Sequence, residues 1–147
     1  MESSVMPEIH QYQNIVYKII GAAMTVHREL NFGLLEAIYQ EALETELNTL
    51  GIQCKTECNV PVYYKGNLLK KHYEIDLLAG DIICELKSVS KIIPAHRAQL
   101  CNYLRLTHKP IGLLINFGTN KLECERWAYR LDTNDCFLVD INLNPVI

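Results

Sequence analysis

The sequence predicts an α/β fold, in which a central mixed sheet of about four to six strands has helices on both sides. Three observations carry this prediction. Apolar residues recur at helical spacing in the N-terminal part, the period then shortens to that of strands, and a further helix separates the last strands from the others. With 147 residues, 49% of them apolar and 21% charged, we expect a single domain over residues 1–147 with its own hydrophobic core.

The N-terminal part of the chain is predicted to form two helices, separated by a break at Asn31-Phe32-Gly33. Apolar residues recur at helical spacing in both segments. Gly51 then marks the C-terminal end of the second helix. The predicted helices cover about residues 9–30 and about residues 34–50.

Short segments rich in β-forming residues follow these helices. Two turn signals, Lys65-Gly66-Asn67 and Ala79-Gly80-Asp81, lie among them. The segments on either side of Gly80 are expected to pair as a β-hairpin. The predicted strands cover residues 52–58, 60–64, 71–78 and 81–87.

The C-terminal part adds a helix and two strands. Pro94 suits the first turn of a helix over about residues 94–106. Residues 111–117 form a nearly continuous apolar run, which is typical of a strand buried on both faces. A further strand is predicted over residues 122–131, and no element is assigned from Asp132 onward.

Positive charge is concentrated in one part of a chain whose net charge is −3. The window from Leu86 to Leu122 contains six Lys or Arg residues and no Asp or Glu, so the rest of the chain carries −9. Such a window is expected where one face of a protein meets a polyanion such as nucleic acid. A solvated helix face followed by a strand would give the same pattern.

The six cysteines include no Cys-x-x-Cys pair, and the first eight residues lack the basic and apolar regions of a secretory signal. We therefore expect reduced thiols in a cytoplasmic protein, several of them in the core. An iron–sulfur or zinc site is the alternative use of these cysteines. No stretch approaches the roughly 20 apolar residues that span a bilayer, so no membrane partner is expected.

Two carboxylates and a lysine are expected to converge at the predicted hairpin. The turn at Gly80 brings Asp76 close to Glu85, and strand alternation places Glu85 and Lys87 on one face. Carboxylates of this kind suit Mg²⁺ or Mn²⁺. The lysine can orient the attacking water and offset charge in a transition state. The set is suited to metal-assisted hydrolysis of a phosphodiester.

Glu-x-Lys is a common triplet, and a surface strand of alternating charge is its other interpretation. The context favours a site, because Glu85 follows an apolar strand and Asp76 lies on the strand before it. Gln99 and Tyr103 then lie four residues apart on one face of the next predicted helix, where they could contact a phosphate or a base.

This combination of Asp76, Glu85-Leu86-Lys87 and a Gln99-x-x-x-Tyr103 helix resembles the PD-(D/E)XK nuclease superfamily. The segment Gly33-Leu34-Leu35-Glu36-Ala37-Ile38-Tyr39 resembles the signature of its GxxExxY family. The likeness extends over roughly residues 10–130 and implies a restriction-endonuclease-like core.

The resemblance implies a role for each matching acidic or basic residue. Asp76 and Glu85 match the metal-binding pair, and Glu36 matches the helical glutamate that completes the acidic site. Lys87 matches the catalytic lysine. Ile75 stands where the superfamily often has a proline, a departure that leaves the ligands in place.

Gln99 and Tyr103 match the helix residues that hold the substrate strand. The implied protein is a Mg²⁺- or Mn²⁺-dependent nuclease that acts on DNA, with RNA as a second substrate to consider. The sequence is also compatible with a homodimer. Two other functions stay open, a nucleic-acid-binding module that does not cleave and a protein-interaction module on the same scaffold. Glu36 and Tyr39 could also be a simple helix-face pair, with Tyr39 in the core.

Overall fold

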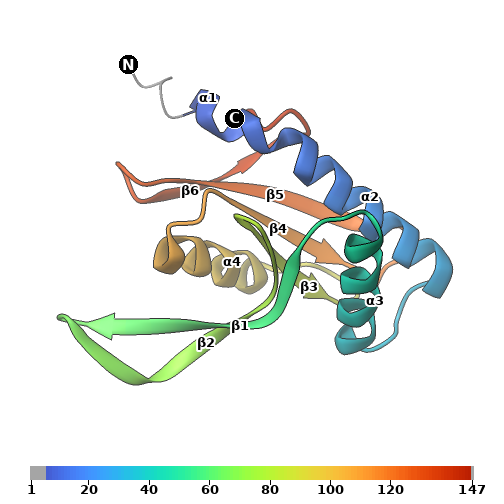
Figure 1. The fold of residues 1–147 in the computed structure, drawn as a ribbon, viewed down its shortest axis with the longest axis horizontal. Coiled ribbons are helices and arrows are strands. Elements are labelled where there is room, and N and C mark those ends of the chain that lie inside the picture. Colours follow the sequence, from blue (N-terminus) through green and yellow to red (C-terminus); the bar gives the residue numbers. More distant parts are fainter. Residues whose placement is uncertain (1–5, 147) are drawn as a thin grey trace.

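A computed structural model describes residues 6–146 and shows a six-stranded mixed sheet with helices on both faces (Figure 1). The strands are β1 (Cys54–Tyr64), β2 (Asn67–Ala79), β3 (Ile82–Lys87), β4 (Ile111–Asn116), β5 (Glu123–Arg130) and β6 (Asp135–Val139). They lie in this order across the sheet. Only β3 and β4 run parallel, and the other neighbours are antiparallel. The predicted α/β fold class is confirmed.

The helices form two layers, one on each face of the sheet. They are α1 (Met6–Ile9), the 3-10 helix η2 (His10–Tyr12), α2 (Gln13–Leu30), α3 (Glu36–Thr49) and α4 (Pro94–Thr107). Helices α2 and α3 share one hydrophobic cluster with the sheet, and α4 shares a second cluster on the opposite face. None of the helices in the described part of the chain combines the length and apolar character needed to cross a membrane.

Strand alternation determines which residues of β3 face each layer. Ile82, Cys84 and Leu86 belong to the cluster of α2 and α3, whereas Ile83 belongs to the cluster of α4. Glu85 is two residues after Ile83 on the strand, so its side chain lies on the same face, the one that α4 covers.

Several predicted boundaries differ from the structure. The strands expected over residues 52–58 and 60–64 are one strand, β1, because its backbone pairs with β2 from Cys54 to Tyr64, with a register shift between Pro61 and Tyr63. The first helix begins with the short elements α1 and η2. Strand β6 lies in the tail where no element was predicted. The expectation that the chain has no secretory signal rests on the first eight residues. Residues 1–5 of these lie outside the part that the structure describes.

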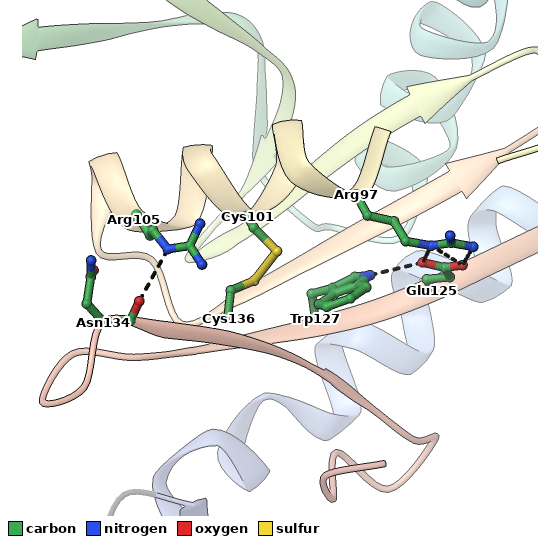
Figure 2. The surroundings of a disulfide bond; sticks show 7 residues. All are labelled: Arg97, Cys101, Arg105, Glu125, Trp127, Asn134 and Cys136. Carbon is green, nitrogen blue, oxygen red and sulfur yellow. Dashed lines mark hydrogen bonds and ion pairs between the residues drawn. A yellow bond between two sulfur atoms is a disulfide. The ribbon is translucent and has the colours of Figure 1, made fainter. Parts of the chain in front are cut away.

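Cysteines 101 and 136 form a disulfide, so the expectation that the cysteines are reduced thiols is wrong for this pair (Figure 2). Cys101 lies on α4 and Cys136 on β6, with Cα atoms 5.7 Å apart. The two residues are 35 positions apart, and only the packing of α4 on the sheet brings them together. The remaining cysteines are free thiols: Cys54, Cys58, Cys84 and Cys124.

Polar contacts hold α4 on the sheet beside the disulfide. The guanidinium of Arg97 makes a bidentate ion pair with Glu125 on β5, with nitrogen–oxygen distances of 2.8–3.0 Å (Figure 2). Lys109, after α4, pairs with Asp81 at 3.3 Å. Part of the basic window is thus neutralised by acidic residues from elsewhere in the chain, and the window is not a uniformly free positive face.

Candidate functional site

Strands β2 and β3 separate at the point where the two predicted metal-binding carboxylates lie. Their ladder runs from Ala79 and Ile82 to Leu77 and Cys84 and stops there. Asp76 and Glu85 are the next residues on the two strands. Beyond this point β3 stays paired only with β4, through Lys87 and Asn116.

The two carboxylates replace the missing ladder hydrogen bonds. The backbone N–H of Leu86 donates to Oδ2 of Asp76 at 2.8 Å, and the N–H of Asp76 donates to Oε1 of Glu85 at 3.3 Å. Gln40 on α3 donates to the carbonyl oxygen of Asp76 at 2.7 Å. The side chains therefore satisfy backbone groups that the parting of the strands leaves unpaired.

Both carboxyl groups are held in surroundings that oppose ionisation. Glu85 is only 3% exposed. Burial and then the negative charge of Asp76 raise the pKa of Glu85 to about 8. Burial likewise raises the pKa of Asp76, to which the charge of Glu36 adds, while the N–H of Leu86 and the charge of Lys87 oppose the rise.

Lys87 connects the carboxylates to α4. Its Nζ donates to Oε1 of Gln99 at 3.2 Å, and Nε2 of Gln99 donates to the hydroxyl of Tyr103 at 3.0 Å. Tyr103 is buried, and its ring meets Tyr73 of β2 edge-on with centroids 5.5 Å apart. The predicted residues Lys87, Gln99 and Tyr103 are thus brought together. The hydroxyl of Tyr103 accepts the hydrogen bond that positions the Gln99 side chain.

Glu36 lies apart from the carboxylate pair, exposed in the first turn of α3. Its charge still raises the pKa values of Asp76 and Glu85, so it faces the same region. Among residues 6–146, no three His, Cys, Asp or Glu side chains are grouped closely enough to hold a metal ion. The structure therefore brings the pair together without Glu36 as a third close ligand.

Tyr39 sets the position of Glu36 from within the core. Its ring stacks on Phe117 with centroids 4.5 Å apart. Its hydroxyl donates to the carbonyl oxygen of Asn31 at 2.6 Å and accepts from the N–H of Leu34 at 3.1 Å. These bonds fix the loop that leads into α3, so the core position of Tyr39 serves the placement of Glu36.

The donor set of Asp76 and Glu85 fits a hard divalent cation. Both are carboxylates, Glu85 buried and Asp76 partly buried, and each has like charge nearby, which a cation would offset. Carboxylate oxygens are the ligands that hard cations such as Mg²⁺ and Mn²⁺ prefer.

Two supporting residues were not identified from the sequence. Gln40 follows Tyr39 on α3, and its spacing of four from Glu36 was a usable signal. Asn116 is fully buried at the end of β4, where it bonds both backbone groups of Val89 at 3.0 Å and so holds the segment after Lys87. Its signal was a polar residue at the end of an apolar run.

His96 lies at the start of α4, where its Nδ1 accepts a hydrogen bond from the N–H of Ile93 at 3.1 Å. Burial, and then the charge of Lys87, lower the pKa of His96. The ring therefore caps the helix that carries Gln99.

Comparison with known proteins gives one family match. A family model described as the PD-(D/E)XK nuclease superfamily matches residues 13–127, a range that includes all six predicted site residues. No curated protein and no solved structure matches the chain.

Proposed function

The chain belongs to the PD-(D/E)XK nuclease superfamily, and on this basis we propose that it is a metal-dependent nuclease that hydrolyses phosphodiester bonds. DNA is the first substrate class to test and RNA the second. The observation that carries the proposal is the meeting of Asp76 and Glu85 where β2 and β3 separate, with Lys87 bonded to Gln99 on the same face. This arrangement supplies metal ligands, a cation and a polar contact at one spot.

In this proposal Asp76 and Glu85 hold the metal and Glu36 is the third acidic partner. Bound Mg²⁺ or Mn²⁺ would polarise the phosphoryl group and favour ionisation of the attacking water. Lys87 orients that water and offsets negative charge on the phosphoryl oxygens. Gln99 contacts the substrate backbone, and Tyr103 keeps Gln99 in position through its hydroxyl.

We also propose that the chain is a member of the GxxExxY branch of the superfamily. Gly33, Glu36 and Tyr39 supply the signature residues. Gly33 has φ +93°, a left-handed conformation that favours glycine, and Tyr39 bonds the same loop. Both features support the interpretation that Gly33 and Tyr39 of the signature position Glu36.

Substitution of Lys87 separates a nuclease from a scaffold that only binds. Lys87→Ala should reduce Mg²⁺- or Mn²⁺-dependent cleavage of single- and double-stranded DNA by about 10²–10⁴-fold, because the reaction site then lacks its cationic side chain. The Mn²⁺-induced rise in melting temperature should be kept, since the lysine is not a ligand. Asp76→Asn should lose both responses.

Lys18→Ala is the matched control, because Lys18 is exposed on α2, in the layer on the other face of the sheet. It should cleave as the wild type does. Unchanged cleavage by Lys87→Ala would mean that a contaminant or another site is responsible. Binding of DNA by the wild type without any cleavage would instead favour the non-catalytic binding module.

A further inference from the structure

The outer part of the β1–β2 hairpin, residues 58–73, extends away from the rest of the sheet, and we call it the arm (Figure 1). Several of its large apolar or aromatic side chains are exposed. Tyr63 and Leu68, which pair across the two strands near the turn, are each 62% exposed. The other exposed members are Tyr64, Leu69 and Tyr73. So many exposed rings and leucines on one hairpin indicate a contact surface.

The arm is also positively charged. It contains Lys65, Lys70 and Lys71 and no Asp or Glu; the acidic residue nearest to these lysines along the chain is Glu74, which follows directly on β2 and pairs with Asn59. All three lysines are exposed. Unlike Arg97 and Lys109 in the basic window, none of them is in an ion pair among the described residues. Exposed lysines interleaved with tyrosines suit a nucleic acid, because the lysines neutralise phosphates while the rings stack on bases.

The arm is continuous with the candidate site. Tyr73 meets Tyr103, which bonds Gln99, which in turn bonds Lys87. Beyond Tyr73 a hollow of about 270 Å³ is lined by Val62, Leu69, Lys71, His72 and Tyr73. Tyr73 thus connects the contacts of the candidate site to Lys71, the arm lysine that lines this hollow.

We propose that the arm is a second nucleic-acid contact of this protein, which binds the part of the substrate that flanks the scissile phosphate. Lys70 and Lys71 contact its phosphates, and the ring of Tyr73 packs on a base or sugar next to Gln99. The inference rests on the proposed nuclease function and adds where the substrate lies. At about 3.4 Å per residue, β2 from Asp76 to Asn67 spans about 30 Å, which matches about nine base pairs of duplex.

The test measures binding of a fluorescent duplex of about 20 base pairs, by anisotropy at several salt concentrations, without divalent metal. Lys70→Ala/Lys71→Ala should reduce the slope of log K against log salt by about 0.9 for each phosphate that the protein no longer neutralises. Tyr73→Ala should weaken binding of a single-stranded DNA of the same length by about 5-fold or more, because an aromatic ring stacks on unpaired bases. The matched controls are Lys18→Ala and Tyr17→Ala, both exposed on α2, and they should bind as the wild type does.

The arm and the nuclease function fail in different ways. If the wild type cleaves but the arm variants bind with unchanged affinity and salt slope, the arm proposal is overturned and the nuclease proposal stands. If the wild type binds through the arm but does not cleave with Mg²⁺ or Mn²⁺, the nuclease proposal falls and the arm remains a nucleic-acid contact.

Light scattering on the same variants tests the other occupant of this surface, a second copy of the chain. A change from dimer to monomer in Lys70→Ala/Lys71→Ala or Tyr73→Ala, with nucleic-acid affinity unchanged, would make the arm a dimer interface and overturn the proposal. Thermal melting of each variant, expected to match the wild type within a few degrees, shows that the fold is kept.

Discussion

Replacing Glu85 by glutamine should stabilise the metal-free protein, and the gain should grow as the pH rises from about 5.5 to about 7.5. Burial and the charge of Asp76 raise the pKa of Glu85 to about 8 in the folded protein. In the unfolded chain the group titrates near 4.5. Between these values the folded state holds a proton that the unfolded state has released, so the stability of the wild type falls as the pH rises. Glutamine does not titrate and is free of this loss.

The size of the effect follows from proton linkage. While the folded state binds one more proton than the unfolded state, the free energy of unfolding falls by at most about 1.4 kcal/mol per pH unit. A rise of about two pH units should therefore increase the difference between Glu85→Gln and wild type by up to about 3 kcal/mol. This is a large part of the roughly 5–15 kcal/mol that typically separates folded from unfolded states.

Urea unfolding at about pH 5.5, 6.5 and 7.5, with EDTA and without reductant, measures this difference. Glu125→Gln is the control. Burial opposes ionisation of Glu125, but the hydrogen bonds from Arg97 and Trp127 outweigh it and lower its pKa. Its contribution is therefore present throughout this range and is lost only at lower pH. A Glu85→Gln difference that stays as constant as that of Glu125→Gln would refute the reasoning.

Two further variants test how the site is held in place. Cys136→Ser removes the disulfide between α4 and β6, and the loop of about 35 residues predicts a loss of about 4 kcal/mol in unfolding free energy. Urea unfolding measures this loss, and the wild type with reductant should lose the same amount. An unchanged midpoint would contradict this prediction. Tyr39→Phe keeps the stack on Phe117 but leaves the carbonyl oxygen of Asn31 without its donor, so stability should fall by about 1–2 kcal/mol. A variant as stable as wild type would show that water replaces that bond.

The positions of Asp76, Glu85 and Lys87 could be predicted because they depend on local rules. The turn at Gly80 sets the register of the hairpin, and strand alternation sets the face. The register of the ladder places Asp76 opposite Glu85, as the turn predicts, although the strands separate there. That separation could not be predicted, because it depends on how β3 pairs with β4 and how α3 contacts β2.

Features that depend on tertiary packing were missed. Nothing in the spacing of Cys101 and Cys136 indicates that helix α4 lies against β6. Strand β6 is short and only partly buried, so its residues carry little periodicity, and pairing with β5 supplies its structure. The role of Asn116 likewise depends on tertiary structure, because its partner Val89 lies in a segment that is distant in the sequence.

Strand β1 is an outer strand of the sheet, and its sequence limits what can pair with it. Pro61 has no N–H to donate, and Lys55 and Glu57 place charges along the same strand. Natural proteins use proline and charge in this way to stop sheets from growing by strand addition between molecules. The exposed tyrosines and leucines of the arm therefore lie beside a backbone edge that resists strand addition between molecules. This apolar surface can stay exposed, and so available to a different kind of partner, without promoting aggregation through the sheet edge.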